Sequence, residues 1–325
     1  MLKNLNPSLA IVLSTLLWGT WWYPLRLLNE YANNNAIPLT LSFMLAGFFL
    51  LSFSLRNVHL LTKKNIILTI VAATAGAAAM CLYNEGLLRG NVARILIFFY
   101  LTAVWSTIIE IVFLRTPLTI YRAFSIAAGF TGLFIITGLD KGNILPTSLA
   151  DLFGITSGFL WSVCATIIRI NKELDVNFGT SIFILIGGLF VIIATLLPDG
   201  QVLTGFNTEI ISNTYIIILI FAFIWLLPGY WLITFGQDQV DPGRAGILLM
   251  FEVVIGIISA YLLANEIITM REFIGAVFVM SAPLIEIYAG NKLYKSVVST
   301  FIHLTNNTGG LVFCSFAEVV LATII

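Results

Sequence analysis

Ten apolar segments, each close to the length needed to cross a lipid bilayer, follow one another along this chain with only short connections between them. A membrane-spanning helix needs about 20 mainly apolar residues to cross roughly 30 Å of hydrocarbon. The segments are continuous apolar runs rather than alternating strands, and lipid offers backbone amides no partner outside a helix or a closed barrel. The sequence therefore predicts ten transmembrane helices, at 8–28, 37–55, 66–88, 93–114, 118–138, 148–169, 179–197, 214–236, 243–264 and 268–289.

The composition supports lipid as the solvent of this fold. Of the 325 residues, 59 % are hydrophobic and 10 % are charged, whereas soluble domains have about 25 % charged residues. The expected fold class is an all-α membrane protein that contacts membrane lipid. The 16 basic and 16 acidic residues give a net charge of zero, so no nucleic acid partner is expected. The sequence leaves a homodimer open.

The basic residues divide unequally between the two predicted membrane faces. Cytoplasmic loops carry an excess of Lys and Arg. With the N-terminus in the cytoplasm, the inner side receives eleven basic residues, Arg271 among them, and the outer side receives five. Those five are Arg26, Arg89, Arg94, Lys141 and Arg244. Both termini are therefore predicted to be cytoplasmic, in what we expect to be a bacterial inner (plasma) membrane.

The two halves of the chain resemble each other. A shift of 150 residues places Gly86 on Gly236 and Arg94 on Arg244, and a shift of 143 places Leu17-Trp18 on Leu160-Trp161. Each half has five predicted spans, and an odd number inverts the second half relative to the first. Inverted repeats are an architecture of secondary transporters. The predicted units are two five-helix repeats, 1–142 and 143–292, and a tail of unknown role, 293–325. The alternative is an old duplication that now serves packing alone.

Several short motifs resemble those of the drug/metabolite transporter superfamily, in its EamA-like branch. Leu16-Leu17-Trp18-Gly19-Thr20 is similar to the opening motif of that family, and Tyr100 to Trp105 is similar to its fourth-span motif. Phe251-Glu252-Val253-Val254 and Asn265-Glu266 resemble its ninth- and tenth-span motifs, although Ala103 and Val253 stand where the motifs have proline. The resemblance covers about 8–290 and implies ten helices in two inverted repeats around a central substrate cavity.

The repeat and the resemblance together predict a secondary active transporter. We expect export or exchange, by alternating access, of a small organic metabolite such as an amino acid or a related compound. No HExxH, GxSxG or P-loop motif is present, so we expect no enzyme, no catalytic residue, no cofactor and no metal site. Two alternatives stay open, an intramembrane lipid-modifying enzyme and a non-transporting scaffold or sensor.

Aromatic and polar residues inside the spans are candidates for substrate binding. Aromatic rings can stack a flat substrate and donate hydrogen bonds. The candidates are Trp18, Tyr83, Asn84, Tyr100, Thr102, Trp161 and Tyr230. For each of them, packing between helices is the alternative role.

Two repeat-equivalent arginines, Arg94 and Arg244, are further candidates. They are predicted at the outer N-termini of the fourth and ninth spans, where the helix dipole is unfavourable to a cation. Binding of an anionic substrate group would explain both positions. Snorkelling of the side chains to the interface is the alternative explanation.

Four carboxylates lie inside predicted spans, where an unpaired charge is costly. Glu252 shares a helical stripe with Arg244, and the 150-residue shift places Thr102 on Glu252, so the two halves are expected to present equivalent faces. We therefore expect Glu252 to be a cavity residue that couples transport to a proton gradient, with a packing role as the alternative. Glu85 is predicted to pair with Arg89 four residues on, Glu110 to lie beside Arg115, and Glu286 to be peripheral to the cavity.

Overall fold

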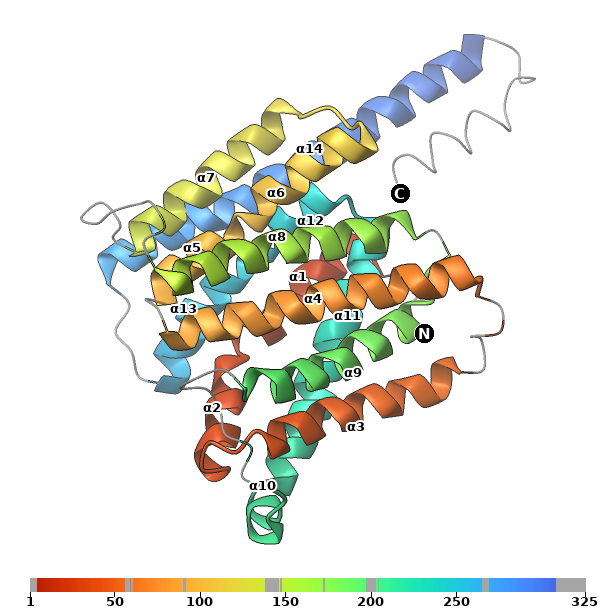
Figure 1. Cartoon of the computed structure of the whole chain (residues 1–325). Coiled ribbons are helices and arrows are strands. Elements are labelled where there is room, and N and C mark those ends of the chain that lie inside the picture. The colour runs from red at the N-terminus through yellow and green to blue at the C-terminus, as the bar shows by residue number, and fades with distance from the viewer. Residues whose placement is uncertain are drawn as a thin grey trace.

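The computed structural model describes residues 5–55, 59, 61–89, 92–137, 146, 148–171, 173–196, 203, 205–264 and 269–307, and for 87–88, 92–94, 137, 264 and 290–307 it describes the backbone alone. Within these residues every extended regular element is a helix and there is no strand, so the all-α prediction is confirmed. Most of the helices run roughly alongside one another across the molecule (Figure 1).

The helices follow the two halves of the chain. The first half contains α1 (Pro7–Gly19), α2 (Trp22–Tyr31), α3 (Ile37–Ser54), α4 (Lys63–Arg89), α5 (Val92–Tyr100), α6 (Thr102–Ile109), a π-helical turn (Glu110–Leu114) and α7 (Ile120–Thr137). The second half contains α8 (Leu149–Ile170), α9 (Val176–Ala194), α10 (Thr208–Ile220), a second π-helical turn (Phe221–Leu226), α11 (Leu227–Gln239), α12 (Pro242–Leu249), α13 (Phe251–Ala264) and α14 (Met270–Asn307).

Most of the predicted spans correspond to helices long enough to cross a membrane. Within the described residues, 8 helical stretches have the necessary length and apolarity. They begin at Ile37, Lys63, Ile95, Leu149, Val176, Thr208, Pro242 and Met270. The predicted span 118–138 is present as a shorter apolar helix, Ile120–Ile136.

The prediction of one continuous span over 8–28 is wrong, because the chain breaks there between α1 and α2. The Thr20 hydroxyl donates to the Leu16 carbonyl at 2.8 Å, and the Trp21 amide donates to the Trp18 carbonyl in a tighter, three-residue turn. Pro24 lies in the first turn of α2, where a missing N–H costs nothing. The two helices together span the predicted segment, with a bend in the middle.

Polar side chains fix several helix starts. Asn6 accepts from the Ser8 and Leu9 amides at the start of α1. Ser148 and Asp151 form a reciprocal capping box at the start of α8. Asn207 caps α10 in a similar way, through the Glu209 amide.

Small residues allow close helix contacts. The alanine-rich α4 packs against α8 and α9, and α7 packs along α14. At the α7–α14 crossing, a Cβ added to Gly275 would lie 2.8 Å from the Gly132 carbonyl oxygen, so only glycine permits this approach of the backbones.

The outer surface of the bundle is apolar. Large side chains on several helices are exposed, including Phe113 at 74 %, Leu196 at 82 % and Leu262 at 66 %. Exposed apolar surface on this scale is unfavourable in water and favourable against lipid tails. The protein is therefore an integral membrane protein.

The last helix is longer than predicted. The span expected to end at Ala289 continues as α14 to Asn307, so the first part of the predicted tail belongs to that helix (Figure 1). The apolar run from Leu311 to Ile325, with Cys314, lies outside the described residues.

Candidate functional site

A cavity of about 520 Å³ lies between the two halves of the chain. This volume falls within the range of about 300–1,000 Å³ that small-molecule sites occupy. Its lining comes from α1, α2, α4, α5 and α7 of the first half and from α8, α12, α13 and α14 of the second. The aromatic lining residues are Trp18, Trp21, Trp22, Tyr83, Phe99, Tyr100 and Trp161.

The cavity reaches one end of the bundle and stops near its middle. Arg26, in the middle of the short helix α2, and Glu272, in the first turn of α14, line it at that end of the bundle. Trp161, in the middle of α8, and Leu249, at the end of α12, line its deep part. Beneath them Tyr230 is 1 % exposed and packs edge-on against Trp18. We call the first region the mouth and the second the floor.

The break between α1 and α2 forms one wall of the cavity. Trp225 Nε1 donates to the Thr20 hydroxyl at 3.0 Å. Trp22 Nε1 donates to the Ser259 hydroxyl, and Ser259 donates to the Gly19 carbonyl, both at 2.9 Å. A Cβ added to Gly19 would lie 2.8 Å from the backbone oxygen of Glu252. Glycine at this position therefore lets α1 approach α13 beside the Glu252 carboxylate.

Two helices break at nearly equivalent positions of the two halves, at the level of the floor. α5 gives way to α6 at Leu101, and α12 gives way to α13 at Met250. At both breaks an amide bonds three residues back rather than four, from Val104 to Leu101 and from Val253 to Met250. The breaks are present although Ala103 and Val253 stand at the positions of the motif prolines. Irregular backbone inside a membrane protein is typical of positions that border a binding cavity.

Backbone carbonyls at these breaks receive hydroxyl donors from other helices. The Tyr100 hydroxyl donates to the Leu249 carbonyl at 3.4 Å, across the two halves. Ser162 donates to the Thr102 carbonyl at 3.1 Å, and the two hydroxyl groups lie 2.9 Å apart. The floor is therefore fixed by hydrogen bonds between the halves as well as by ring contacts.

Glu252 is the charged group in the deep part of the cavity. It lies in the first turn of α13 and is half-buried against the cavity. The Tyr100 and Tyr83 hydroxyls lie near its carboxylate. At the mouth, the Arg26 guanidinium lies 5.2 Å from the centre of the Trp22 ring, a cation–π contact.

The structure brings together most, but not all, of the predicted substrate-binding residues. The cavity is lined by Trp18, Tyr83, Asn84, Tyr100, Trp161 and Glu252. Thr102 and Tyr230 are buried behind the lining, so the expectation that Thr102 and Glu252 present equivalent faces to the cavity does not hold. The break at Met250 interrupts the stripe on which that expectation was based. The side chain of Arg94 lies outside the described residues.

The prediction that Arg244 lies at the same end as Arg94 is wrong. The start of α8 lies beside Arg89, whose guanidinium is 5.9 Å from the Phe153 ring centre. At the other end of α8, Arg169 donates to the Asp238 carbonyl at 3.2 Å, only a few residues before Arg244. The path of the chain is the physical reason: α12 begins directly after α11, whose last turn lies beside Arg169 at that end of α8.

The predicted position of Arg271 is also wrong, in the opposite direction. Its Nε donates to the Ile135 carbonyl at 2.6 Å, next to the cavity-lining residues Ile136 and Glu272. Arg271 therefore lies at the mouth end rather than at the predicted inner side. Relative to the prediction, Arg244 and Arg271 therefore exchange ends of the bundle.

Several lining residues were absent from the predicted site, notably Trp21, Trp22, Arg26, Phe99 and Glu272. Trp21, Trp22 and Arg26 follow the α1–α2 break. Gly19 and Pro24 inside an apolar run were the sequence signal for such a break. Phe99 and Glu272 carry no local signal, because only the helix arrangement brings them to the cavity.

The end of the bundle opposite the mouth is closed by a buried ion cluster. Arg122 in α7 donates to Glu110 at 2.8 Å and to Glu286 at 3.2 Å. The Glu110 carboxylate also accepts from the Thr116 hydroxyl at 2.9 Å and from the Gly243 amide, at the N-terminus of α12, at 3.0 Å. We call these five residues the ion cluster. The prediction that Glu110 lies beside Arg115 is therefore wrong about its partner, which is Arg122.

The other predicted carboxylate pair behaves as expected. Arg89 donates to Glu85 at 2.7 Å, so the prediction that these i, i+4 neighbours neutralise each other is confirmed. Glu286 lies away from the cavity lining, at the closed end, where it is 5 % exposed. Its place in the ion cluster had no signal in the sequence.

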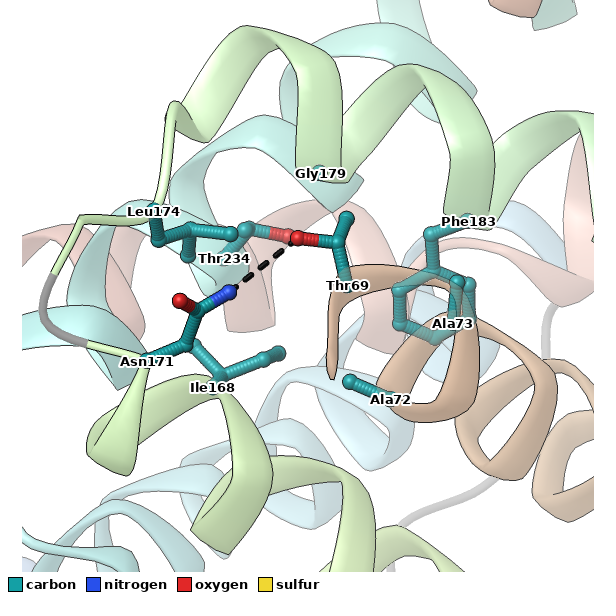
Figure 2. Close-up of a pocket in the computed structure, with 9 residues that line it drawn as sticks. All are labelled: Thr69, Ala72, Ala73, Ile168, Asn171, Leu174, Gly179, Phe183 and Thr234. Carbon is teal, nitrogen blue, oxygen red and sulfur yellow. Dashed lines mark hydrogen bonds between the residues drawn. The ribbon is translucent and has the colours of Figure 1, made fainter. Parts of the chain in front are cut away.

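A second, very small pocket lies between α4, α8, α9 and α11 (Figure 2). Its volume of about 10 Å³ is that of a single water molecule. The Asn171 amide donates to the Thr69 hydroxyl at 3.1 Å beside it, as Figure 2 shows. This pocket is too small for a metabolite, so the large cavity is the candidate substrate site.

Comparisons with known proteins agree with this architecture. The profile of the EamA-like transporter family matches the chain twice, over residues 6–138 and 148–285. The "Uncharacterized transporter YoaV" of Bacillus subtilis (strain 168) is 18 % identical over 275 residues, which cover 83 % of this chain and 93 % of that protein. A solved structure described as "Crystal structure of protein" has a TM-score of 0.68 at 13 % identity, covering 88 % of this chain and 98 % of that one, and so shares the fold. Because the family profile accounts for most of the sequence in two consecutive copies, the chain belongs to the EamA-like transporter family.

Proposed function

We propose that this protein is a secondary active transporter of a small organic metabolite, such as an amino acid or a related compound, and that it works by alternating access. In this proposal ten helices form two inverted repeats, 1–142 and 143–292. The protein lies in a bacterial inner membrane with both termini in the cytoplasm, and the cavity mouth faces outward.

The observation that carries the proposal is the contrast between the two ends of the cavity. A metabolite-sized hollow reaches the bundle surface at the mouth, and the ion cluster closes the bundle beyond the floor. Alternating access requires one state open to each side of the membrane. A cavity between two repeats, open at one end and closed at the other, has the geometry of one such state.

The position of Arg244 supports the inverted relation of the repeats. Its repeat-equivalent, Arg94, begins the helix that follows Arg89, whereas Arg244 lies near Arg169 at the other end of α8. Two equivalent residues at opposite ends are what an inverted repeat requires, and a parallel repeat would bring them to the same end.

Transport itself is tested by reconstitution. Purified protein in proteoliposomes should exchange labelled amino acids or amines across the membrane faster than protein-free liposomes. Ala260 lines the cavity, and Ala260→Trp should lower the exchange rate by about tenfold or more because the new ring fills the hollow. Leu262 is 66 % exposed on the lipid side of the same helix, so Leu262→Trp is the matched control and should keep the wild-type rate. Equal rates in the two variants would exclude the cavity as the transport path.

We further propose that Glu252 couples transport to a proton gradient. Glu252→Gln keeps the size of the side chain and removes its charge, so it should impair gradient-driven flux. Glu209, exposed in the first turn of α10, provides the control Glu209→Gln, which changes the net charge by the same amount. Normal gradient-driven flux in Glu252→Gln would remove Glu252 from the mechanism.

A further inference from the structure

The charges around the cavity are unevenly placed. Of the described lining residues, the charged ones are Arg26, Glu252 and Glu272. Arg26 is exposed at the mouth over the Trp22 ring. Glu272, also at the mouth, accepts from the Thr269 amide and hydroxyl at 2.7 and 2.8 Å. The only charge in the deep part of this lining is therefore negative.

Glu252 has no cationic partner within the part of the chain that the structure describes. The ion pairs among these described side chains all join other residues, in the ion cluster or at the bundle ends. The neighbours of its carboxylate are the hydroxyls of Tyr83 and Tyr100, which are neutral. A carboxylate at membrane depth without a counter-charge is unfavourable. A positively charged ligand would supply the counter-charge that Glu252 lacks.

The walls around Glu252 favour a cation over an anion. Aromatic rings carry partial negative charge on their faces and attract positive groups. Tyr83 packs against Phe99 at a ring distance of 4.6 Å, and Trp18 stacks on Trp21 at 4.9 Å, so rings from three helices and the α1–α2 break enclose the space next to the carboxylate. A hydrated metal ion is a poor match, because a divalent cation needs several oxygen ligands and this part of the cavity offers a single carboxylate.

We propose that the cavity binds an organic cation, a protonated amine attached to a flat apolar body. The ammonium group pairs with the Glu252 carboxylate, and the apolar body lies against Tyr83, Phe99 and Trp21. The Asn84 amide, also in the lining, offers a hydrogen-bond partner to a polar substituent. This inference adds a substrate class to the proposed transport function, and binding tests it independently of flux.

Three probes of nearly equal size separate charge from shape. Phenethylamine is a cation, 2-phenylethanol is neutral and 3-phenylpropanoate is an anion. Their binding to the purified protein can be followed by tryptophan fluorescence, because several tryptophans line the cavity. We expect phenethylamine to bind at least about tenfold more tightly than the alcohol, the scale of one desolvated charge pair, and the anion to bind most weakly.

Variants of Glu252 decide whether this carboxylate causes the preference. Glu252→Gln should make the amine bind no better than the alcohol while the affinity for the alcohol stays within about twofold. Glu252→Asp keeps the charge and should keep the preference, and Glu209→Gln should behave as wild type. If Glu252→Gln fails to fold, loss of the preference in a Glu252→Asp protein that still binds the alcohol would count against the proposal.

Three results would overturn the inference: equal binding of amine and alcohol, preferred binding of the anion, or an unchanged preference in Glu252→Gln. Failure of the transport function gives a different result. In that case the amine still binds through Glu252, but proteoliposomes show no exchange of it.

Discussion

The two ends of the helical bundle differ in whether their buried charged side chains have partners of opposite charge. At the mouth end a cavity remains between the halves, and the Glu252 carboxylate at its depth has no cationic partner among the described residues. At the other end Arg122 binds two carboxylates, and Glu110 accepts three different donors. The carboxylate at the first end therefore lacks a counter-charge, whereas the charges of the ion cluster at the second end are paired with one another, with only the second Glu286 oxygen left without a hydrogen-bond partner.

This difference separates residues that hold the structure from residues available to a ligand. Buried polar groups that are fully hydrogen-bonded specify one packing arrangement. An unpaired carboxylate beside an open volume is instead poised to bind a charged ligand. We therefore expect substitutions at the ion cluster to lower stability and substitutions at the cavity to lower binding.

The largest expected effect follows removal of Arg122. Arg122→Ala leaves Glu110 and Glu286 buried without their shared partner, and breaking a buried pair costs about 3–5 kcal/mol. We expect a large fall in the thermal unfolding temperature of the purified protein. The triple variant Arg122→Met, Glu110→Gln and Glu286→Gln removes all three charges together and should recover much of the loss. An unfolding temperature unchanged by Arg122→Ala would show that the closed end does not depend on the cluster.

A smaller effect is expected at Gly19, where α1 crosses α13 beside the cavity. The Cβ of Gly19→Ala would lie 2.7 Å from the Ile255 Cβ, so α13 must move, at a cost of about 1–3 kcal/mol. Because Glu252 lies on α13, phenethylamine binding should weaken as well. Gly256 also lines the cavity, but an added Cβ meets nothing closer than 3.8 Å. Gly256→Ala is therefore the matched control and should leave stability nearly unchanged.

The smallest effect is expected at the α1–α2 break. Trp225→Phe removes the 3.0 Å hydrogen bond to the Thr20 hydroxyl, and one such bond contributes about 0.5–1.5 kcal/mol. We expect a modest fall in unfolding temperature, measured beside Trp231→Phe, whose hydrogen bond to Asn177 is exposed. A smaller loss for Trp225→Phe than for Trp231→Phe would indicate that the break does not need this bond.

The sequence predicted which residues lie at the cavity better than it predicted which residues they contact. Trp18 and Trp161 were matched by the repeat, and the structure places their rings 6.5 Å apart at the floor. Glu252 was expected at the cavity and lines it. The Thr102 prediction failed because the helix breaks after Tyr100 and at Met250 change the direction of every later side chain. An α-helix turns about 100° per residue, so a break of one residue is enough to turn the side chains that follow it toward a different face.

Most span positions and the family membership followed from the sequence alone, because the length of an apolar run and the order of short motifs are local properties of the chain. The tertiary structure decided which polar groups meet. Arg122 pairs with Glu286 across 164 residues, and no local pattern in either segment identifies the other as its partner. The tertiary structure also decided that one end of the bundle has a cavity and the other is closely packed. How helices from the two halves cross depends on the shape of the side chains at each contact. The hydrophobicity that determined the spans does not specify those contacts.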